Sequence, residues 1–262
     1  AALQGRLGRG RSGRGLRHGL VVLQFTLAAA LIMATLLVRS QVGHMQHADL
    51  RFDRSGLVVL RVDRGDFADG EAAAVRLETF REELRRLGGV ASVASSSHVP
   101  GDWGGSFTFV WPGDGDDEDR LRMRQAVVDD RFFATYGIPF REGRPFDRDR
   151  PTDRDEAVIL NEAALAAFGW TSAEGKTVRR GDDYYDVVGV VNDYHFQSLQ
   201  NEIAPVLHFF RSPEHSVHDF VTARLRPGDV SGTLAAMEAT WRKVDPSRAL
   251  PYVFVDDRFT QL

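Results

Sequence analysis

A short polar stretch after an apolar segment carries the side chains best suited to chemistry in this sequence. The apolar segment VVGVV, residues 187–191, is followed by Asn192, Asp193, His195, Gln197 and Ser198. A carboxylate, an imidazole and a hydroxyl are the groups with which a hydrolase activates and orients its nucleophile. If a strand continues through residue 195, Asp193 and His195 point to the same face, because side chains alternate along a strand. These residue types therefore raise the hypothesis of a hydrolase site.

The surrounding sequence favours a structural role for the same residues. A hydrolase needs a nucleophile on a strained turn, and the Gly-x-Ser-x-Gly pattern of such turns does not occur in the chain. Short polar side chains also hydrogen-bond to free backbone groups where a strand ends. We therefore predict that Asn192, Asp193 and His195 stabilise a strand end. A membrane-anchored hydrolase that uses His195 and Asp193 stays open as an alternative.

Three further clusters have residue types that bind metals, but each lacks part of a ligand set. The acidic segment 114–119 does not match the calcium loop of an EF-hand, which needs glycine at position six and glutamate at position twelve. Two His-x-x-His pairs, His44 with His47 and His215 with His218, lack the glutamate of a zinc-protease motif and a third ligand. We predict that the acidic segment is a solvated hairpin end, and that the chain has no catalytic residue, no cofactor and no metal.

Charge is distributed unevenly along the 262 residues. The chain has 33 basic and 37 acidic side chains, a net charge of −4. Six of the basic residues and none of the acidic ones lie in residues 1–39, which leaves 27 basic against 37 acidic, a net of −10, in the remainder. An acidic body disfavours nucleic acid as a partner. Cysteine is absent, which excludes disulfides and thiolate chemistry.

The apolar segment GLVVLQFTLAAALIMATLLV, residues 19–38, predicts a transmembrane helix. It carries no charge, and as a helix it spans about 30 Å, the thickness of the hydrocarbon core. It is longer than the apolar part of a signal peptide, and Arg39 follows it at once. We predict a cytoplasmic basic linker over 1–18, a transmembrane helix over 19–42, and an extracytoplasmic body from about residue 43, since arginines favour the cytoplasmic side.

Two strand–helix–strand units are predicted at the two ends of this body. The strands are expected at 57–62 and 90–95 in the first unit, and at 220–226 and 251–255 in the second. Each intervening helix has apolar residues at helical spacing: Leu77, Phe80, Leu84 and Leu87 in the first, and Leu234, Met237, Trp241 and Val244 in the second. Two such units separated by more than a hundred residues indicate one α+β subdomain with a second one inserted into it.

The inserted region, residues 99–211, is rich in predicted strands. Two hairpins are expected, one from SFTFVW and RMRQAVV around the acidic segment, and one from KTVRR and YYDVVGVV that turns at residues 181–183. Two more strands are expected at EAVIL and PVLHFF, and two short helices at DDRFFATYG and NEAALAAFGW. The region therefore predicts a strand-rich subdomain.

Several of these segments, taken in order, resemble those of a known family. The segment LRHGLVVLQFTLAAALIMATLLV resembles the helix that opens a repeat in MacB/FtsX-like ABC transporter permeases. The segments VVDDRFFATYGIPFREGRPF, AVILNEAALAAFGW, GKTV and VVGVVNDYHFQSLQNEIAPVL resemble successive parts of the MacB-like periplasmic core domain of that family. YVFVDDRFTQL resembles the lead into a following transmembrane helix.

The resemblance implies a particular fold and domain division. The fold is α+β, with one N-terminal transmembrane helix followed by a discontinuous porter-like subdomain of two βαβ units. This subdomain covers 43–98 and 212–258, and a strand-rich sabre-like subdomain is inserted over 99–211. Residues 259–262 lead into the next transmembrane helix. The two chain crossings, near Pro100 and near Ser212 and Pro213, are expected to act as hinges.

The resemblance also implies a function without catalysis in this chain. The domain would relay ATP-driven motion for export or release of a substrate from the inner membrane, and ATP would be hydrolysed in a separate nucleotide-binding subunit or domain. The implied partners are an ABC ATPase subunit, a second permease copy or repeat, the lipid bilayer, and a periplasmic adaptor or substrate protein. An extracellular sensor domain of a membrane receptor stays open as an alternative, since it has the same layout of one span and an outer α/β body.

Overall fold

A computed structural model describes residues 12–46, 52–62, 70–100, 106–196, 202–211 and 219–256. For residues 12–18, 37–46 and 70–73 it describes the backbone only. The chain divides into two units, residues 1–48 and residues 49–262. The first unit contains one helix, and the second, called the body below, contains all the strands.

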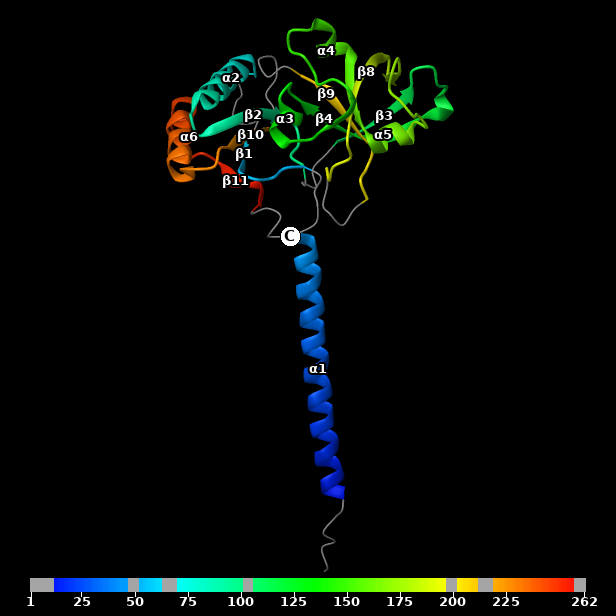
Figure 1. Ribbon diagram of the computed structural model, residues 1–262, viewed down its shortest axis with the longest axis vertical. Helices are drawn as coiled ribbons and strands as arrows, with labels where there is room; N and C mark the ends of the chain where they lie inside the picture. Colours follow the sequence, from blue (N-terminus) through cyan, green and yellow to red (C-terminus); the bar gives the residue numbers. More distant parts are fainter. Residues whose placement is uncertain are drawn as a thin grey trace, which may run out of the picture. The chain divides into compact units, whose positions relative to one another are not determined.

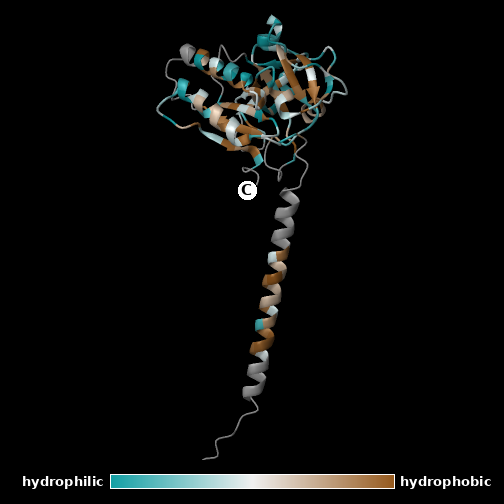
Figure 2. Cartoon of the chain, turned by 60° about the vertical axis from the view of Figure 1, so that its left-hand side comes forward, coloured by the Kyte–Doolittle hydropathy of each residue, from teal (hydrophilic) through white to brown (hydrophobic). Residues whose placement is uncertain are grey.

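The first unit is the helix α1, Ser12–Gln46. Within it, residues 19–36 have a mean hydropathy of 2.1 and are exposed, so this stretch is long and apolar enough to cross a membrane (Figure 2). The hydroxyls of Thr26 and Thr35 donate hydrogen bonds to the backbone carbonyls of Val22 and Leu31, at 2.9 and 2.8 Å. These bonds suit a lipid environment, because lipid tails offer no partner for a polar group.

One half of the body has four strands and two helices, and is called the four-strand half. Its elements are β1 (Leu57–Arg61), α2 (Gly70–Arg86), β2 (Val90–Ser96), β10 (Phe220–Leu225), α6 (Val230–Val244) and β11 (Tyr252–Phe254). The strand order is β11-β1-β10-β2, and all neighbours are antiparallel. Each strand–helix–strand unit is therefore split by a strand of the other unit, which ties the two distant chain segments together.

Helices α2 and α6 lie together on the four-strand half (Figure 1). Phe80 of α2 meets Trp241 of α6 edge to face, with ring centroids 5.3 Å apart. Val58 and Leu60 of β1 belong to the same apolar cluster as these rings, whereas Leu57 belongs to another. Strand β1 is thus buried on both faces, which explains why its sequence is apolar without alternation.

The other half is a closed circuit of six strands, called the six-strand ring. Its strands are β3 (Ser106–Pro112), β4 (Leu121–Val128), β6 (Ala157–Asn161), β7 (Thr177–Arg180), β8 (Asp183–Val191) and β9 (Val206–Phe210). Pairing runs β4-β3-β7-β8-β6-β9 and returns from β9 to β4. The pairs β6–β8 and β4–β9 are parallel and the others antiparallel. Closure of the circuit pairs strands that are distant in sequence.

Short elements connect and cover the ring. They are the 3-10 helix η2 (Asp117–Asp119), α3 (Phe132–Tyr136), β5 (Phe140–Gly143), α4 (Pro151–Glu156) and α5 (Glu162–Ala167). Helix α3 is almost wholly apolar and buried, and it ends at Gly137, whose φ of 64° is the left-handed conformation that glycine adopts without strain. It contacts strands β2 and β10 of the other half, and its Phe133 ring meets His208 of β9 in the ring.

The two halves share one core. Ser96 of β2 pairs with Val128 of β4, so that one sheet runs through the body. One apolar cluster contains residues from both halves, among them Leu57, Val59, Phe132, Tyr136 and Val206. Residues 49–262 accordingly form one compact unit. The subdomain boundaries expected near residues 98 and 211 stay a prediction.

The predicted α+β fold with one N-terminal apolar helix is confirmed, and the ring is inserted between the two units of the four-strand half. Both predicted hairpins and all the predicted strands of the body occur, with small shifts at their ends. Strand β5 and helix α4 were not predicted. FREG and PTDRDE have no apolar periodicity, and these elements form because of what they pair with and contact.

Candidate functional site

The polar stretch after β8 lies where β6 ends and α5 begins. Asn161 is the N-cap of α5: its side-chain oxygen accepts hydrogen bonds from the backbone N–H of Ala164 and of Val206, at 3.0 and 2.9 Å. Its amide nitrogen donates to Asp193 Oδ1 at 2.8 Å. The same carboxylate oxygen accepts from the backbone N–H of Ala163 at 2.9 Å. Asp193 and Asn161 together connect the ends of β6 and β8 with the starts of α5 and β9.

These contacts give Asp193 a structural role. Its carboxylate neutralises the positive end of α5 and satisfies an N–H that the helix itself leaves free. Asn192 and His195 lie partly buried beside it, and the backbone N–H of Asn192 donates to the Pro139 carbonyl at 2.9 Å. Gln197 and Ser198 lie outside the described residues. The geometry agrees with the predicted strand-end role for Asp193.

Of the three clusters considered as metal sites, the structure describes the side chains of the acidic segment 114–119 alone. The acidic segment is exposed, and Asp119 accepts a hydrogen bond from the backbone N–H of Asp116 at 2.9 Å within its own turn. Among the described residues, no group of histidine and carboxylate side chains forms a metal site. The side chains of His44 and His47 and the pair His215 and His218 lie outside the part of the chain whose side chains are described, so these two pairs stay untested.

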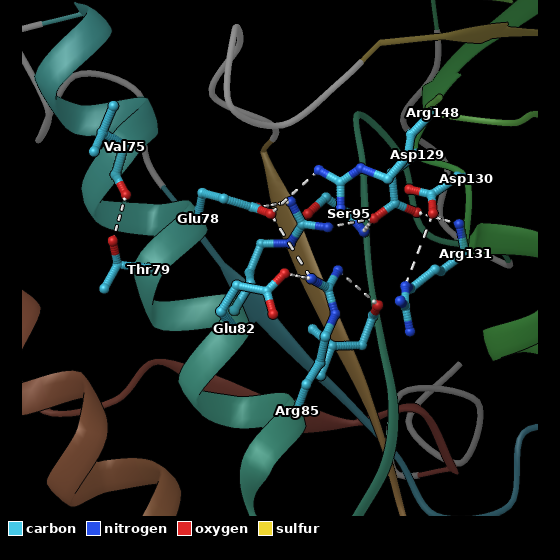
Figure 3. Close-up of polar contacts among 12 residues, drawn as sticks. Val75, Glu78, Thr79, Glu82, Arg85, Ser95, Asp129, Asp130, Arg131 and Arg148 are labelled. Atoms are coloured by element: carbon cyan, nitrogen blue, oxygen red, sulfur yellow. Dashed lines mark hydrogen bonds and ion pairs between the residues drawn. The ribbon is translucent and has the colours of Figure 1, made fainter. Parts of the chain in front are cut away.

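A buried ion network that the sequence did not predict joins the two halves (Figure 3). Arg81 of α2 donates to Asp129, which follows β4, at 2.5 Å, and the exposed fractions of the two side chains are 2% and 0%. Arg81 also donates to Glu78 at 2.5 Å. The same Asp129 oxygen, Oδ2, also accepts a hydrogen bond from the backbone N–H of Ser95 at 2.8 Å, and Oδ1 accepts one from the backbone N–H of Arg131 at 3.1 Å. The carboxylate therefore binds α2 and β2 from the ring side of the body.

More charges surround this pair. Arg85 donates to Glu82 and lies 3.7 Å from Glu78, and Arg148 lies 3.7 Å from the same Glu78 oxygen. A signal for the network was present in the sequence. Arg81 falls on the apolar stripe of α2, between Phe80 and Leu84, and a charged residue on the buried face of a helix needs a buried partner.

Burial sets the protonation behaviour of the pair. Loss of water raises the pKa of the Asp129 carboxyl to about 6, and the charge of Arg81 acts in the opposite direction. Burial likewise lowers the pKa of Arg81, opposed by the charges of Asp129 and Glu78. A buried pair of this kind costs solvation, so it fixes the geometry of the contact more than it adds net stability.

Two further contacts cross between the halves. The hydroxyl of Tyr136 on α3 is 2.8 Å from the Thr222 hydroxyl on β10, and both are buried. Arg224 of β10 donates to the carbonyl of Thr135 at 2.9 Å and to the carboxylate of Asp53 at 2.7 Å. With the Arg81–Asp129 pair, these bonds hold α3 and the end of β4 against the four-strand half.

One more titratable pair lies inside the shared core. His208 of β9 is fully buried, its Nε2 is 2.7 Å from the Tyr194 hydroxyl and its Nδ1 is 3.1 Å from the Ile159 carbonyl. Burial lowers the pKa of His208 to about 4, and burial raises the pKa of Tyr194. The Phe132 and Phe133 rings pack against the imidazole. This histidine is therefore neutral at pH 7 and has a packing role.

Comparison with known proteins gives one family and two similar structures. The sequence model of the MacB-like periplasmic core domain matches residues 20–239. The fold is similar to the periplasmic region of MacB from Actinobacillus actinomycetemcomitans, with a TM-score of 0.54 and 15% identity over 83% of this chain and 96% of that one. It is also similar to the extracellular domain of the ABC-type transporter YknZ from Gram-positive bacteria, with a TM-score of 0.52 and 14% identity over 75% and 97% of the two chains. No curated protein sequence matches at a comparable level.

Proposed function

Since the chain belongs to the family of MacB-like periplasmic core domains of ABC transporter permeases, we propose that it relays ATP-driven motion for the export or release of a substrate. The observation that carries this proposal is the extent of the family match. It covers residues 20–239, and so includes both the apolar helix and most of the body. Such a domain is not itself an enzyme, and the strand-end hydrogen bonds of Asp193 agree with this.

The body is suited to transmit motion because its two halves share a core and a buried ion network. A rotation of one half against the other would separate Arg81 from Asp129, and a charge that stayed buried would lose its partner. Leaving one charge of a buried pair without its partner costs about 3–5 kcal/mol. We therefore replace the expectation of hinges between the halves with a relay in which the body moves as one piece.

The proposed partners follow from the family. An ABC ATPase subunit or domain would hydrolyse ATP in the cytoplasm, and a second permease copy or repeat would form the dimeric assembly. A helix in the bilayer would shift during the ATP cycle and move the body outside, where an adaptor or a substrate protein would respond. The family match also favours a permease over the sensor domain that the sequence left open.

Distances between spin labels test the relay in the complete transporter with its ATPase. The chain has no cysteine, so introduced cysteines are the only labelling sites in it. Arg86→Cys on α2 with Asp182→Cys in the β7–β8 turn measures the distance between the two halves, and both positions are exposed. Asp182→Cys alone measures the distance between two copies. We expect ATP to change the second distance and to leave the first unchanged.

The other outcomes of this measurement are equally clear. A change in the distance within one body would restore the hinge between the halves. If neither distance changes on addition of ATP or during turnover, the body does not relay motion and the proposed function fails. The resting distance within the body, measured without ATPase, controls for distortion by the labels.

Labelling of intact cells tests the proposed location. Ser12→Cys lies before the apolar stretch of α1 and Ser55→Cys lies in the body. We expect a membrane-impermeant maleimide to label Ser55→Cys from outside the inner membrane and to leave Ser12→Cys unlabelled until the cells are opened. Labelling of Ser12→Cys in intact cells would show the opposite orientation.

A further inference from the structure

The outward face of the hairpin β3–β4 has an unusual composition. Side chains alternate along a strand, and the buried Val110 marks the inner face of β3. Phe107, Phe109 and Trp111 therefore share the outer face. Phe107 is 44% exposed and Phe109 is 48% exposed. Two exposed phenylalanines at alternate positions of one strand are not explained by the core of the body.

Arginines on β4 and just before it cover these rings. The register places Arg124 opposite Phe107 and Arg122 opposite Phe109. The guanidinium of Arg122 lies 3.8 Å and that of Arg124 4.4 Å from the centroid of Phe107, and Arg120 lies 4.7 Å from that of Phe109. Stacking on a ring fixes the plane of each guanidinium and leaves its N–H edges free to bind an anion.

The three arginines lack a negative partner within the described part of the chain. Arg120, Arg122 and Arg124 form no ion pair there, whereas the neighbouring Arg179 stacks on Trp111 and lies 3.5 Å from Asp117. The pKa of Arg124 is lowered by burial and then by the charge of Arg122. Arg122 and Arg124 therefore repel each other, and an anion bound between them would relieve this repulsion.

The backbone next to this face is also available. Within the described residues, Ser106 to Val110 pair with β4 alone, and β7 joins β3 only at Trp111 and Pro112. Strand β3 thus presents an edge beside the aromatic face over this length. An exposed strand edge binds extended peptides through backbone hydrogen bonds, with side chains of the sheet giving specificity.

We propose that the outer face of β3–β4, formed by Phe107, Phe109, Arg120, Arg122 and Arg124, binds an extended acidic segment of a separate extracytoplasmic protein. Arginines at alternate positions of a strand repeat about every 6.8 Å, the same repeat that alternate residues of an extended peptide have. Acidic side chains at every second position of the partner would face the arginines, and the intervening side chains would point to the opposite face of the sheet. Aromatic and arginine side chains are also those enriched at protein interfaces.

The acidic end of the same hairpin argues against a broad anionic surface such as a lipid bilayer. Five carboxylates lie at the end of the hairpin, directly beside the arginines: Asp114, Asp116, Asp117, Glu118 and Asp119. A flat anionic surface that approached the arginines would also meet these charges, whereas a single peptide strand along β3 avoids them. The proposal rests on the proposed function only for its placement of this face outside the cytoplasm.

Peptide binding to the full chain in nanodiscs of zwitterionic lipid tests the proposal. The probe is a fluorescein-labelled octapeptide with glutamate and valine alternating, and fluorescence anisotropy gives its Kd. The comparison peptide has the same composition with its glutamates in one block. We expect the alternating peptide to bind about tenfold more tightly than the block peptide, a difference of about one or two good contacts.

Variants of the chain separate charge from ring contacts. Arg122→Glu is expected to weaken binding of the alternating peptide about tenfold or more, because it replaces attraction by repulsion. The pair Phe107→Ser with Phe109→Ser keeps the charge and is expected to weaken binding several-fold. The matched control is Arg154→Glu, an equally large change of charge at an exposed site on α4, which is expected to leave the Kd unchanged. Circular dichroism of each variant checks that the body is folded.

Three results would overturn the proposal. Equal binding of the alternating and block peptides would show attraction by charge alone, without the strand face. An equal loss with Arg154→Glu would show the same. Binding to vesicles of anionic phosphatidylglycerol that is lost in Arg122→Glu, together with no binding of the peptide, would assign the face to a lipid surface. None of these results depends on transport, so the experiments test the docking proposal independently of the proposed relay function.

Discussion

The ion pair of Arg81 and Asp129 places two opposite charges where neither reaches water. Asp129 is satisfied by the Arg81 guanidinium and by the backbone N–H of Ser95, and Arg81 by two carboxylates. Within the described residues, the Nε of Arg81 has no hydrogen-bond partner. The pair is thus incompletely satisfied and its solvation cost is not fully recovered. Its contribution is to the geometry of the contact between α2 and the end of β4.

Removal of one partner is expected to cost much more than removal of both. Asp129→Asn should lower the free energy of unfolding by about 3 kcal/mol or more, since Arg81 keeps its buried charge. Arg81→Met with Asp129→Asn removes both charges, keeps a side-chain oxygen for the Ser95 N–H, and should recover most of this loss. Urea unfolding of the full chain in detergent, followed by tryptophan fluorescence, measures both. Arg242→Met, which breaks the exposed pair with Glu238, is the control and should cost about 0.5 kcal/mol or less.

Burial of His208 makes the stability of the body depend on pH. The unfolded chain binds a proton on this histidine near pH 6.5, and the folded chain only near pH 4, because burial lowers the pKa to about 4. The unfolded state therefore binds more protons between these values. The stability that comes from keeping His208 neutral is complete above pH 6.5 and is lost as the pH falls toward 4.

We expect this loss to be about 3 kcal/mol between pH 7 and pH 4, from a difference of about 2.5 pKa units. His208→Gln does not titrate, so its free energy of unfolding should fall less over the same range. The difference between the two slopes isolates His208 from other groups such as Asp129, whose raised pKa acts in the opposite direction between pH 3.8 and about 6. Equal slopes in wild type and variant would contradict the assignment.

At the scale of elements, glycine decides how closely β5 and β8 approach. Gly143 at the end of β5 has a φ of 75°, and a Cβ there would overlap the carbonyl oxygen of Val188. Gly189 faces it on β8, where a Cβ would lie 2.6 Å from the Arg144 carbonyl oxygen. Two glycines are therefore needed opposite each other for this pairing to form.

Two matched substitutions separate backbone strain from overlap. Gly175→Ala meets the strain of a φ of 67° alone, with no atom within 4 Å of its Cβ, and should cost about 1 kcal/mol. Gly143→Ala meets the same strain and the overlap with Val188, and should cost about 2 kcal/mol more. Urea unfolding compares the two. Equal costs would mean that β5 moves away from β8 without penalty.

The elements that the sequence predicts well are those with a local signal. The apolar stripe of α6 and the alternation in both hairpins depend on neighbouring residues, and the structure has them where expected. Strand β5 has no such signal, since its residues are strand only through pairing with β8. The sequence predicts that Asp193 hydrogen-bonds to backbone groups at a strand end, although it does not identify the Ala163 N–H as the partner. It does not predict the partner of Arg81, because Asp129 lies 48 residues away and only the fold brings the two together.

At the scale of the whole molecule, the connection between the halves decides how the body can move. Ser96 and Val128 form the single residue pair that links β2 to β4 in the described sheet. The backbone bonds beside it, from Ser97 N–H to the Val127 carbonyl and from Asp129 N–H to the Ser95 carbonyl, make it a non-hydrogen-bonded pair. The Cα atoms of such a pair lie about 4.5 Å apart, within the range that a disulfide spans.

A disulfide between Ser96→Cys and Val128→Cys therefore tests the one-piece relay without distortion of the fold. Any motion that separates the four-strand half from the six-strand ring has to break this pair, because it is the point at which β2 joins β4. If the body moves as one piece, oxidation of the pair should leave ATP turnover of the assembled transporter unchanged relative to the reduced form. The chain has no other cysteine, so only this bridge can form within it. Ser96→Cys alone under the same oxidant is the control, and turnover that falls on oxidation and returns on reduction would mean that the halves must separate after all.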